Sequence, residues 1–158
     1  MTKSKHKKLI IFTDGAARGN PGPAGAGSLI IDPEGHVLAE MSEYLGETTN
    51  NVAEYTALIL ALEKASKFNA EEIEIRSDSE LLVRQLSGEY KVKNEGLKPL
   101  VERVRSLLSG YKRVGVKHIY RSENARADVL ANEAIDKFKK GEKREFRLGD
   151  IPEQGSLF

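Results

Sequence analysis

Four acidic residues stand where the sequence pattern indicates the end of one structural element or the beginning of another. Asp14 and Asp78 each close a short apolar run that we interpret as a buried strand, whereas Glu54 and Asp128 stand near the expected starts of helices. In open α/β sheets, the ends of neighbouring parallel strands form the usual ligand-binding edge. We therefore expect these carboxylates to converge at one end of a sheet.

A cluster of carboxylates without partners is costly, because burial and mutual repulsion raise the pKa of some members. A divalent cation removes that cost. The chain contains no cysteine, and a set of oxygen ligands favours Mg²⁺ or Mn²⁺ over zinc. Two such ions about 3.5–4 Å apart can activate water and stabilise the leaving oxygen of an in-line displacement. The pattern therefore predicts metal-dependent hydrolysis of a phosphate ester.

Each acid also has an ordinary structural explanation when it is taken alone. The Asp14-Gly15 pair is typical of a turn, and Asp78-Ser79 is typical of a helix cap. Glu54 and Asp128 are acids of the kind that interact favourably with the start of a helix. Only their joint placement favours a shared site.

The order of the expected elements is three strands, a helix, a strand, two helices, a strand and a final helix. Hairpins followed by alternating helices and strands are typical of a mixed sheet with flanking helices, so we expect an α/β fold. The expected strands cover about 9–12, 28–31, 36–45, 73–77 and 114–120, and the expected helices about 52–68, 79–87, 97–108 and 127–139.

The glycine-rich segment 19–27 separates the first two expected strands. It lacks the Gly-Lys-Ser/Thr of a phosphate-binding loop and does not match the dinucleotide-binding pattern. Two interpretations remain open. The glycines either let neighbouring backbones of the protein approach closely, or they let a nucleic-acid backbone approach the loop.

The composition indicates a single soluble domain of 158 residues with a net charge of only +1. The distribution of charge is uneven: residues 32–80 carry 12 acids and 3 bases, whereas residues 81–147 carry 17 bases and 9 acids. This asymmetry suggests an acidic centre beside a phosphate-facing surface, although scattered solvated side chains would give the same count. The longest apolar run, Ala57–Leu62, is too short to cross a membrane, and we expect a cytoplasmic location.

Four segments, each carrying one of the acids, together resemble the signature of the type 1 ribonuclease H family. The resemblance covers about residues 8–138, and its motifs are Thr13-Asp14-Gly15 with Gly19-Asn-Pro-Gly22, Thr49-Asn-Asn-Val-Ala-Glu54-Tyr55, Ser77-Asp78-Ser79-Glu-Leu-Leu-Val83 and Glu123-Asn-Ala-Arg-Ala-Asp128-Val-Leu-Ala-Asn132. It implies a five-stranded mixed sheet with three antiparallel N-terminal strands and flanking helices. It also implies two-metal hydrolysis of the RNA strand of RNA–DNA hybrids, which leaves 5′-phosphate and 3′-hydroxyl ends.

The resemblance also implies roles for individual residues. Asp14, Glu54, Asp78 and Asp128 take the metal-binding and catalytic positions for two Mg²⁺ ions, with Mn²⁺ as an alternative, and Asp14 bridges both ions. Hybrid contacts are expected at Gly15, Asn20, Thr49, Asn50, Asn51, Ser79 and Asn124. Asparagine amides suit this task, because they donate to and accept from the 2′-hydroxyl that distinguishes RNA from DNA.

The sequence departs from some members of the family in two places. The segment Ser87–Gly96 is short, so the long basic insertion of those members is absent. Some members also use a loop histidine before the last carboxylate to help release the product. His118 falls near that position but inside an expected strand, and Arg121 at the strand's end is an alternative that would contact the scissile phosphate.

The termini are expected to flank the catalytic domain, residues 9–139, as a basic arm (1–8) and a charged tail (140–158). The last five residues, with Gln154, Leu157 and Phe158, resemble the short peptide by which bacterial replication and repair proteins bind the sliding clamp. Otherwise we expect a monomer whose partner is an RNA–DNA hybrid duplex.

Two other functions fit parts of the pattern. A related two-metal nuclease, such as a 3′–5′ exonuclease or a transposase-like enzyme, would share the fold. The exonucleases normally carry Asp-x-Glu on the first strand, where this chain has Asp14-Gly-Ala. A non-catalytic hybrid-binding module is the alternative from another class, and the presence of all four acids argues against it.

Overall fold

The computed structural model describes residues 6–141. Its secondary structure consists of five strands and four α-helices, with two short 3₁₀ helices. The strands are β1 (Lys8–Ala17), β2 (Gly22–Ile31), β3 (Val37–Thr48), β4 (Glu72–Ser77) and β5 (Arg113–His118). The helices are α1 (Asn50–Ala65), η1 (Ser66–Phe68), α2 (Glu80–Leu86), α3 (Lys98–Leu108), η2 (Arg121–Asn124) and α4 (Ala125–Lys139).

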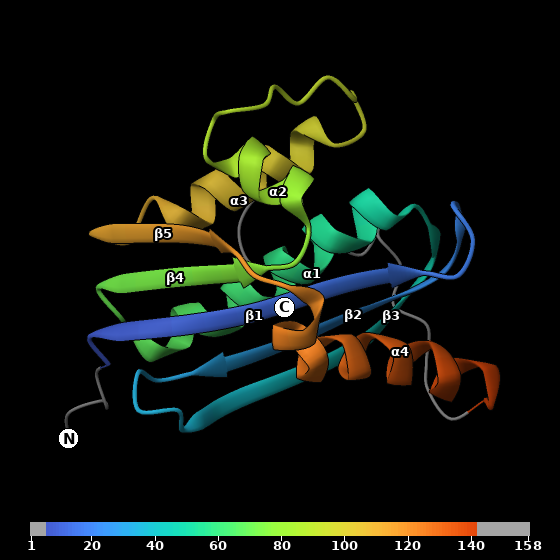
Figure 1. The fold of residues 1–158 in the computed structure, drawn as a ribbon, viewed down its shortest axis with the longest axis horizontal. Helices are drawn as coiled ribbons and strands as arrows, with labels where there is room; N and C mark the ends of the chain where they lie inside the picture. Colours follow the sequence, from blue (N-terminus) through green and yellow to red (C-terminus); the bar gives the residue numbers. More distant parts are fainter. Residues whose placement is uncertain (1–5, 142–158) are drawn as a thin grey trace.

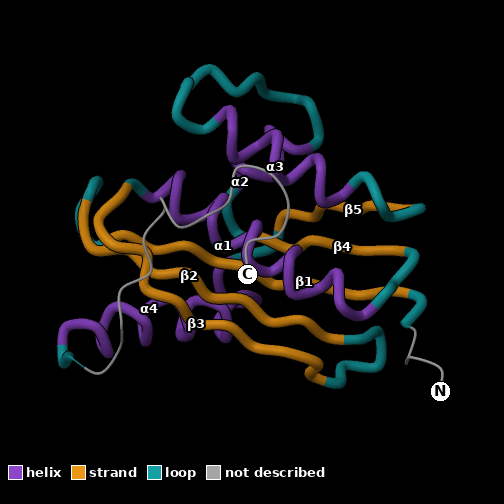
Figure 2. Tube along the Cα trace, turned by 180° about the vertical axis from the view of Figure 1, so that it is seen from behind, coloured by secondary structure: helices purple, strands orange, loops and turns teal. Residues whose placement is uncertain are grey.

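The five strands form one mixed sheet in the order β3-β2-β1-β4-β5. The hairpins β1–β2 and β2–β3 are antiparallel, whereas β4 is parallel to both β1 and β5. Helices α1 and α4 lie on opposite faces of this sheet, and α2 and α3 lie on the same side as α1 (Figures 1 and 2). The expected mixed sheet with three antiparallel N-terminal strands is confirmed.

Helix α1 is buried on nearly all sides, because it lies between the sheet and α3. Its central residues, Ala57 to Leu62, are each no more than 1% exposed. The helix begins after Thr49, whose side-chain oxygen accepts a hydrogen bond from the backbone N–H of Val52. A helix fixed by such a cap and by packing on two sides holds its N-terminal end firmly against the sheet.

Strand β1 is longer than the sequence pattern indicates. We expected it to end in a turn at Asp14-Gly15, but it continues to Ala17, because Gly15, Ala16 and Ala17 pair with Ala26, Gly25 and Ala24 of β2. The small side chains of this segment carry no apolar alternation, so their pairing with β2 could not be read from local sequence. Asp14 therefore lies within β1, paired with Gly27 of β2 and one residue beyond the last pair with β4, Thr13–Ser77.

The glycines of β2 allow close packing of protein against protein. A Cβ atom at Gly27 would lie 2.1 Å from the carbonyl oxygen of Ala127, and one at Gly25 would lie 2.2 Å from that of Ala131. Helix α4 thus packs directly on the backbone of β2. At these two positions the structural interpretation of the glycine-rich segment is correct.

The turn between β2 and β3 lies at the end of the sheet where β1 begins (Figure 1). Asp32 closes it, since its carboxylate accepts a hydrogen bond from the backbone N–H of His36 at 2.8 Å. Gly35 has a φ of +92° and its surroundings are open. Within residues 6–141, none of the helices is long and apolar enough to span a bilayer.

Candidate active site

Asp14 and Asp78 are neighbours because of the parallel register of β1 and β4. Thr13 pairs with Ser77, so the residues that follow them leave the two strands side by side. Asp14 is only 6% exposed, whereas Asp78 is half-buried immediately beyond the last residue of β4. The prediction that Asp78 closes a strand is confirmed.

Glu54 reaches the same place from α1. The helix approaches β1 so closely that a Cβ atom at Gly15 would lie 2.2 Å from the carbonyl carbon of Ala53. At this contact the backbone N–H of Gly15 donates a hydrogen bond to Oε1 of Glu54 at 3.1 Å. Since α1 begins at Asn50, Glu54 lies just beyond the first turn rather than within it. Close packing, not an interaction with the helix end, fixes its position.

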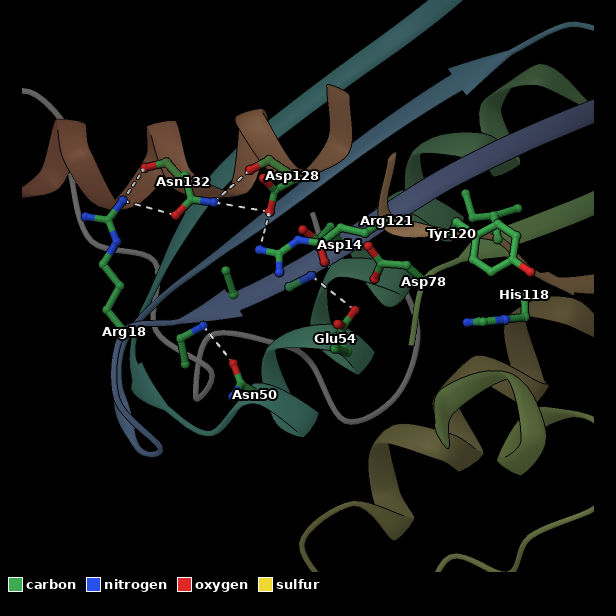
Figure 3. A pocket seen from close by; sticks show the side chains of 14 residues that line it. Asp14, Arg18, Asn50, Glu54, Asp78, His118, Tyr120, Arg121, Asp128 and Asn132 are labelled. Atoms are coloured by element: carbon green, nitrogen blue, oxygen red, sulfur yellow. Dashed lines mark hydrogen bonds and ion pairs between the residues drawn. The ribbon is translucent and has the colours of Figure 1, made fainter. Parts of the chain in front are cut away.

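The carboxylates of Asp14, Glu54 and Asp78 form one group, in which one oxygen atom from each residue lies within 4.8 Å of the other two. Asp128 joins it from the first turn of α4 and is close enough to Asp14 to share a hydrogen bond. All four line a cavity of about 470 Å³. Figure 3 shows these side chains turned toward a common space.

The carboxylates of this group are destabilised in their ionised form, and a positive charge among them would relieve this. Burial, followed by the negative charges of Asp78 and Asp128, raises the pKa of Asp14 from 3.8 to about 8, although Arg121 opposes the shift. Burial also raises the pKa of Glu54 well above its usual value, with Asp14 and Asp78 adding to the effect. Oxygen donors crowded within reach of one position, in a chain without cysteine, fit a divalent cation such as Mg²⁺.

Arg121 and His118 border the cavity on the side of β5. Arg121 is 83% exposed, and its Nη2 atom lies 3.9 Å from Oδ1 of Asp128. His118 was expected inside a strand and is the last residue of β5, and its ring lies edge-on to that of Tyr120 at 6.4 Å. Both side chains are exposed next to the carboxylates, so a phosphate bound there would be within their reach.

Known proteins resemble this chain over most of its length. A sequence family described as reverse transcriptase-like matches residues 12–134. Ribonuclease HI of Halobacterium salinarum is 45% identical over 129 residues, which are 82% of this chain and 65% of that protein. The structure of LC11-RNase H1 in complex with an RNA/DNA hybrid has 51% sequence identity and a TM-score of 0.80, covering 83% of this chain and 99% of that one. This chain belongs to the type 1 ribonuclease H family.

The ribonuclease H relatives differ in overall length. The bifunctional protein Rv2228c of Mycobacterium tuberculosis is 43% identical over 130 residues, which are 82% of this chain and 36% of that protein. The chain thus spans 65% and 36% of the length of the two curated relatives described here. The ribonuclease H family is metal-dependent, and the acidic group of this chain could hold such an ion.

The residues expected to contact a ribonuclease H substrate fall into two groups. Asn20, Asn50 and Asn51 are exposed near the start of α1. In the second group, Thr49 and Ser79 are half-buried and act as helix caps, because their hydroxyl oxygens accept from Val52 and Leu82.

Two expected contacts look different once the side chains are placed. Asn124 is 1% exposed, and its Nδ2 atom donates to the carbonyl oxygen of Thr13 at 2.9 Å. This burial leaves no surface of Asn124 that a substrate could reach, so we correct the expected contact to a structural tie between η2 and β1. The backbone N–H of Gly15 already donates to Glu54. RNA could therefore contact the carbonyl oxygen of Gly15, or its N–H only if the bond to Glu54 were broken.

Two polar side chains of the ribonuclease H cavity were not singled out from the sequence. Arg18 and Asn132 both line it. Asn132 stands four residues after Asp128, a spacing that places both on one face of a helix, so this part was readable. No local signal connects Arg18 to α4.

The residues of the suggested clamp peptide, Gln154, Leu157 and Phe158, lie outside the residues that the structure describes.

Proposed function

We propose that this protein hydrolyses the RNA strand of RNA–DNA hybrids endonucleolytically, with two divalent cations, and leaves 5′-phosphate and 3′-hydroxyl ends. The observation that supports this most directly is the meeting of Asp14, Glu54, Asp78 and Asp128 around one cavity. Burial raises the pKa of Asp14 and of Glu54, a cost that bound cations would offset. A solved relative with 51% identity was crystallised with an RNA/DNA hybrid.

The carboxylates form two overlapping donor sets that share Asp14. Asp14, Glu54 and Asp78 make one set, and Asp14 with Asp128 makes the other. We assign one Mg²⁺ position to each set, with Mn²⁺ as a substitute. When bound, the two cations supply an activated water and charge stabilisation for the leaving 3′-oxygen. The protein's own contribution is to hold the carboxylates in place through β1, β4, α1 and α4.

Asn20 and Asn50 would read the hybrid through amide N–H groups. The Oδ1 atom of Asn20 accepts from the backbone N–H of Asn50, and Oδ1 of Asn50 accepts from that of Ala17, both at 3.0 Å. Since each oxygen accepts a bond inside the protein and both side chains are exposed, their NH₂ groups can donate to a ligand. Minor-groove base edges and 2′-hydroxyl oxygens are acceptors, so the two amides match an RNA-containing minor groove. We assign further hybrid contacts to Thr49 and Asn51, which adjoin Asn50 in the chain, and to Ser79, which follows Asp78.

Arg121 would contact the phosphate chain, because its guanidinium is exposed beside Asp128. A planar guanidinium binds phosphate oxygens in a bidentate manner. His118 is the second candidate for this role, from the end of β5. Phosphate contacts supply affinity without sequence information, so the proposal includes cleavage with little sequence preference.

The remaining parts of the proposal concern the whole chain. We assign catalysis to residues 9–139 and treat 1–8 and 140–158 as flanking segments. The active form is proposed to be a monomer in the cytoplasm, where hybrids form during copying and transcription of DNA. The Gln154–Phe158 peptide is proposed to bind a sliding clamp, as its resemblance implies.

A cleavage assay on matched RNA–DNA, RNA–RNA and DNA–DNA duplexes with Mg²⁺ or Mn²⁺ tests the proposal. The wild type should cut only hybrid RNA, and Asp78→Asn should lower cleavage roughly 10³-fold while leaving the fold intact. A duplex with internal ribonucleotides should give internal cuts, whereas an exonuclease would give a ladder from the end. A wild type that binds hybrid tightly but never cuts it would show the protein to be a binding module.

A further inference from the structure

A chain of hydrogen bonds connects the turn after β1 to Asp128 on α4. Arg18 donates from Nη1 to Oδ1 of Asp136 at 2.8 Å and from Nη2 to Oδ1 of Asn132 at 3.1 Å. Asn132 in turn donates from Nδ2 to the backbone oxygen of Asp128 at 3.0 Å and to its Oδ1 atom at 3.3 Å. Figure 3 shows the part of this chain that runs from Arg18 through Asn132 to Asp128, along the face of α4 that borders the cavity.

The orientation of the Asn132 amide follows from its partners. A guanidinium carries only donors, so the amide atom that faces Arg18 has to be the oxygen. The NH₂ group is then turned toward Asp128, and it donates to the carboxylate rather than competing with it. Arg18 therefore selects the rotamer in which Asn132 supports Asp128.

Asp128 is the carboxylate that most needs such support. It lies outside the group formed by Asp14, Glu54 and Asp78, and its side chain is 31% exposed. Arg121 lies on its other side at 3.9 Å, also in contact with Oδ1. Without Asn132, the Asp128 carboxylate would be free to rotate toward Arg121 and solvent, away from Asp14.

We propose that Arg18 and Asn132 act as positioning residues for Asp128 and thereby set the affinity of the cation position that Asp14 and Asp128 share. We call this pair of residues the Arg18–Asn132 brace. The proposal rests on the proposed function, because it takes Asp128 to be a cation ligand. Partners that hydrogen-bond to a ligating carboxylate typically change metal affinity by about 10–100-fold. The partial exposure of the brace places its effect at the lower end of that range.

The brace also joins the cation position to the hybrid-reading surface. Arg18 is two residues before Asn20, and its backbone N–H donates to the carbonyl oxygen of Pro23 at 2.8 Å. The turn that presents Asn20 is thus fixed to the same helix that presents Asp128. Loss of the brace should weaken cation binding first and hybrid binding to a smaller extent.

Calorimetric titration of the full chain with MnCl₂ tests the brace without cleavage. The wild type should show two binding steps, and we assign the weaker one to the position that only Asp14 and Asp128 share. Asn132→Ala should weaken this step about tenfold and leave the stronger step unchanged. Arg18→Ala should weaken the same step about threefold. Arg18→Lys should recover part of that loss, because lysine keeps the positive charge but cannot donate to Asn132 and Asp136 from a planar guanidinium. The double variant should bind Mn²⁺ no more weakly than Asn132→Ala does, since both residues act through one chain of contacts.

Arg126→Ala is the matched control. Arg126 makes a two-point ion pair with Glu40, with Nε and Nη2 each 2.8 Å from a carboxylate oxygen, and it also connects α4 to the sheet. Its removal should leave both Mn²⁺ steps unchanged. A single Mn²⁺ step in the wild type, an unaltered weaker step in folded Asn132→Ala, or an equal loss in Arg126→Ala would overturn the proposal.

The kinetic readout separates this proposal from the proposed function. In Asn132→Ala, the Mg²⁺ concentration for half-maximal cleavage should rise about tenfold, with a smaller change in KM for the hybrid. A purely structural brace would lower Tm without moving that midpoint. If the wild type bound Mn²⁺ in two steps but cut no hybrid, the proposed function would fail while the positioning of Asp128 would still be measured by the titration.

Discussion

Oε1 of Glu54 accepts a hydrogen bond from the backbone N–H of Gly15, so a carboxylate on a helix is fixed to the residue next to a carboxylate on a strand. The contact depends on the absence of a side chain at Gly15, where α1 and β1 touch. The geometry of the carboxylate group is therefore set by how closely two elements pack. This relationship makes the site sensitive to a substitution that changes no charged residue.

Gly15→Ala should impair both stability and cleavage. The added methyl group would lie 2.2 Å from backbone atoms of Ala53, and overpacking of this kind costs about 1–3 kcal/mol or more. We expect a lower Tm in thermal unfolding and a loss of cleavage greater than the loss of folded protein. Gly110→Ala is the control, since a Cβ atom there would meet nothing within 4 Å. Wild-type stability of Gly15→Ala would show that α1 can shift without cost.

The metal-free protein should lose stability as the pH rises. The pKa of Asp14 is about 8 in the folded protein and 3.8 as its ordinary value. Across this window the folded state holds the extra proton, so the free energy of unfolding falls with rising pH and levels off above about pH 8. Glu54 acts in the same direction. Thermal unfolding in EDTA at several pH values measures the effect.

Two comparisons show whether Asp14 causes that loss. Asp14→Asn should be more stable than the wild type at alkaline pH and should differ little from it near pH 4. Saturating Mg²⁺ should remove most of the pH dependence of the wild type, because the ion stabilises the ionised carboxylates. Parallel pH curves for the wild type and Asp14→Asn would contradict the assignment.

Asn50→Ala should weaken hybrid binding more than turnover. It removes the outward amide and the acceptor for the Ala17 N–H, which together amount to about 1–2 kcal/mol. Steady-state kinetics should show KM for the hybrid raised roughly tenfold at that energy and kcat changed much less. Asn69→Gly is the control. Asn69 precedes the start of β4, at the end of that strand away from Asp78, and glycine keeps the left-handed backbone of the position. An equal fall in kcat would assign Asn50 to the chemical step.

Arg121→Ala should lower kcat/KM about tenfold through loss of one charge-assisted phosphate contact. The slope of the logarithm of affinity against that of salt concentration should become less steep by about one unit. Arg121→Lys should retain the salt slope but not all of the rate. His118→Ala should have the smaller effect of the two alanine variants. A salt slope unchanged in Arg121→Ala would mean that Arg121 does not contact phosphate.

Deletion of residues 154–158 should abolish capture of a bacterial sliding clamp and leave hybrid cleavage unchanged. The reason is that the apolar Leu157-Phe158 pair and Gln154 would form the whole recognition element. A pull-down with purified clamp measures binding, and the hybrid assay measures activity on the same samples. Replacement of Ser156 by alanine is a control within the same segment. Unchanged clamp capture by the truncated protein would refute this partner.

The sequence predicted that the acids converge because two of them, Asp78 and Asp128, stand at element ends that a local pattern marks. Asp78 closes a strand, and Asp128 opens a helix, as the pattern indicated. The extension of β1 beyond Asp14 was missed, since Gly15 to Ala17 become strand only through pairing with β2. Pairing across the β1–β2 hairpin overrides local propensity there.

Side-chain networks between distant segments were the least predictable part of the site. Asn124 was expected at the substrate because it belongs to the motif of Asp128, but its amide is enclosed by β1. Arg18 and Asn132 are separated by 114 positions and meet only because α4 packs on the glycines of β2. Periodicity and capping describe single elements, and they carry no information about which surfaces of two elements will touch.

The turn between β2 and β3 offers a point of attachment that leaves the carboxylates undisturbed. Glu34 is exposed there, at the end of the sheet where β1 begins. The chain contains no cysteine, so Glu34→Cys would introduce a single thiol for a fluorophore or a surface tether. Individual molecules immobilised through that thiol would present the cavity to passing hybrids, and successive cuts by one enzyme could be timed.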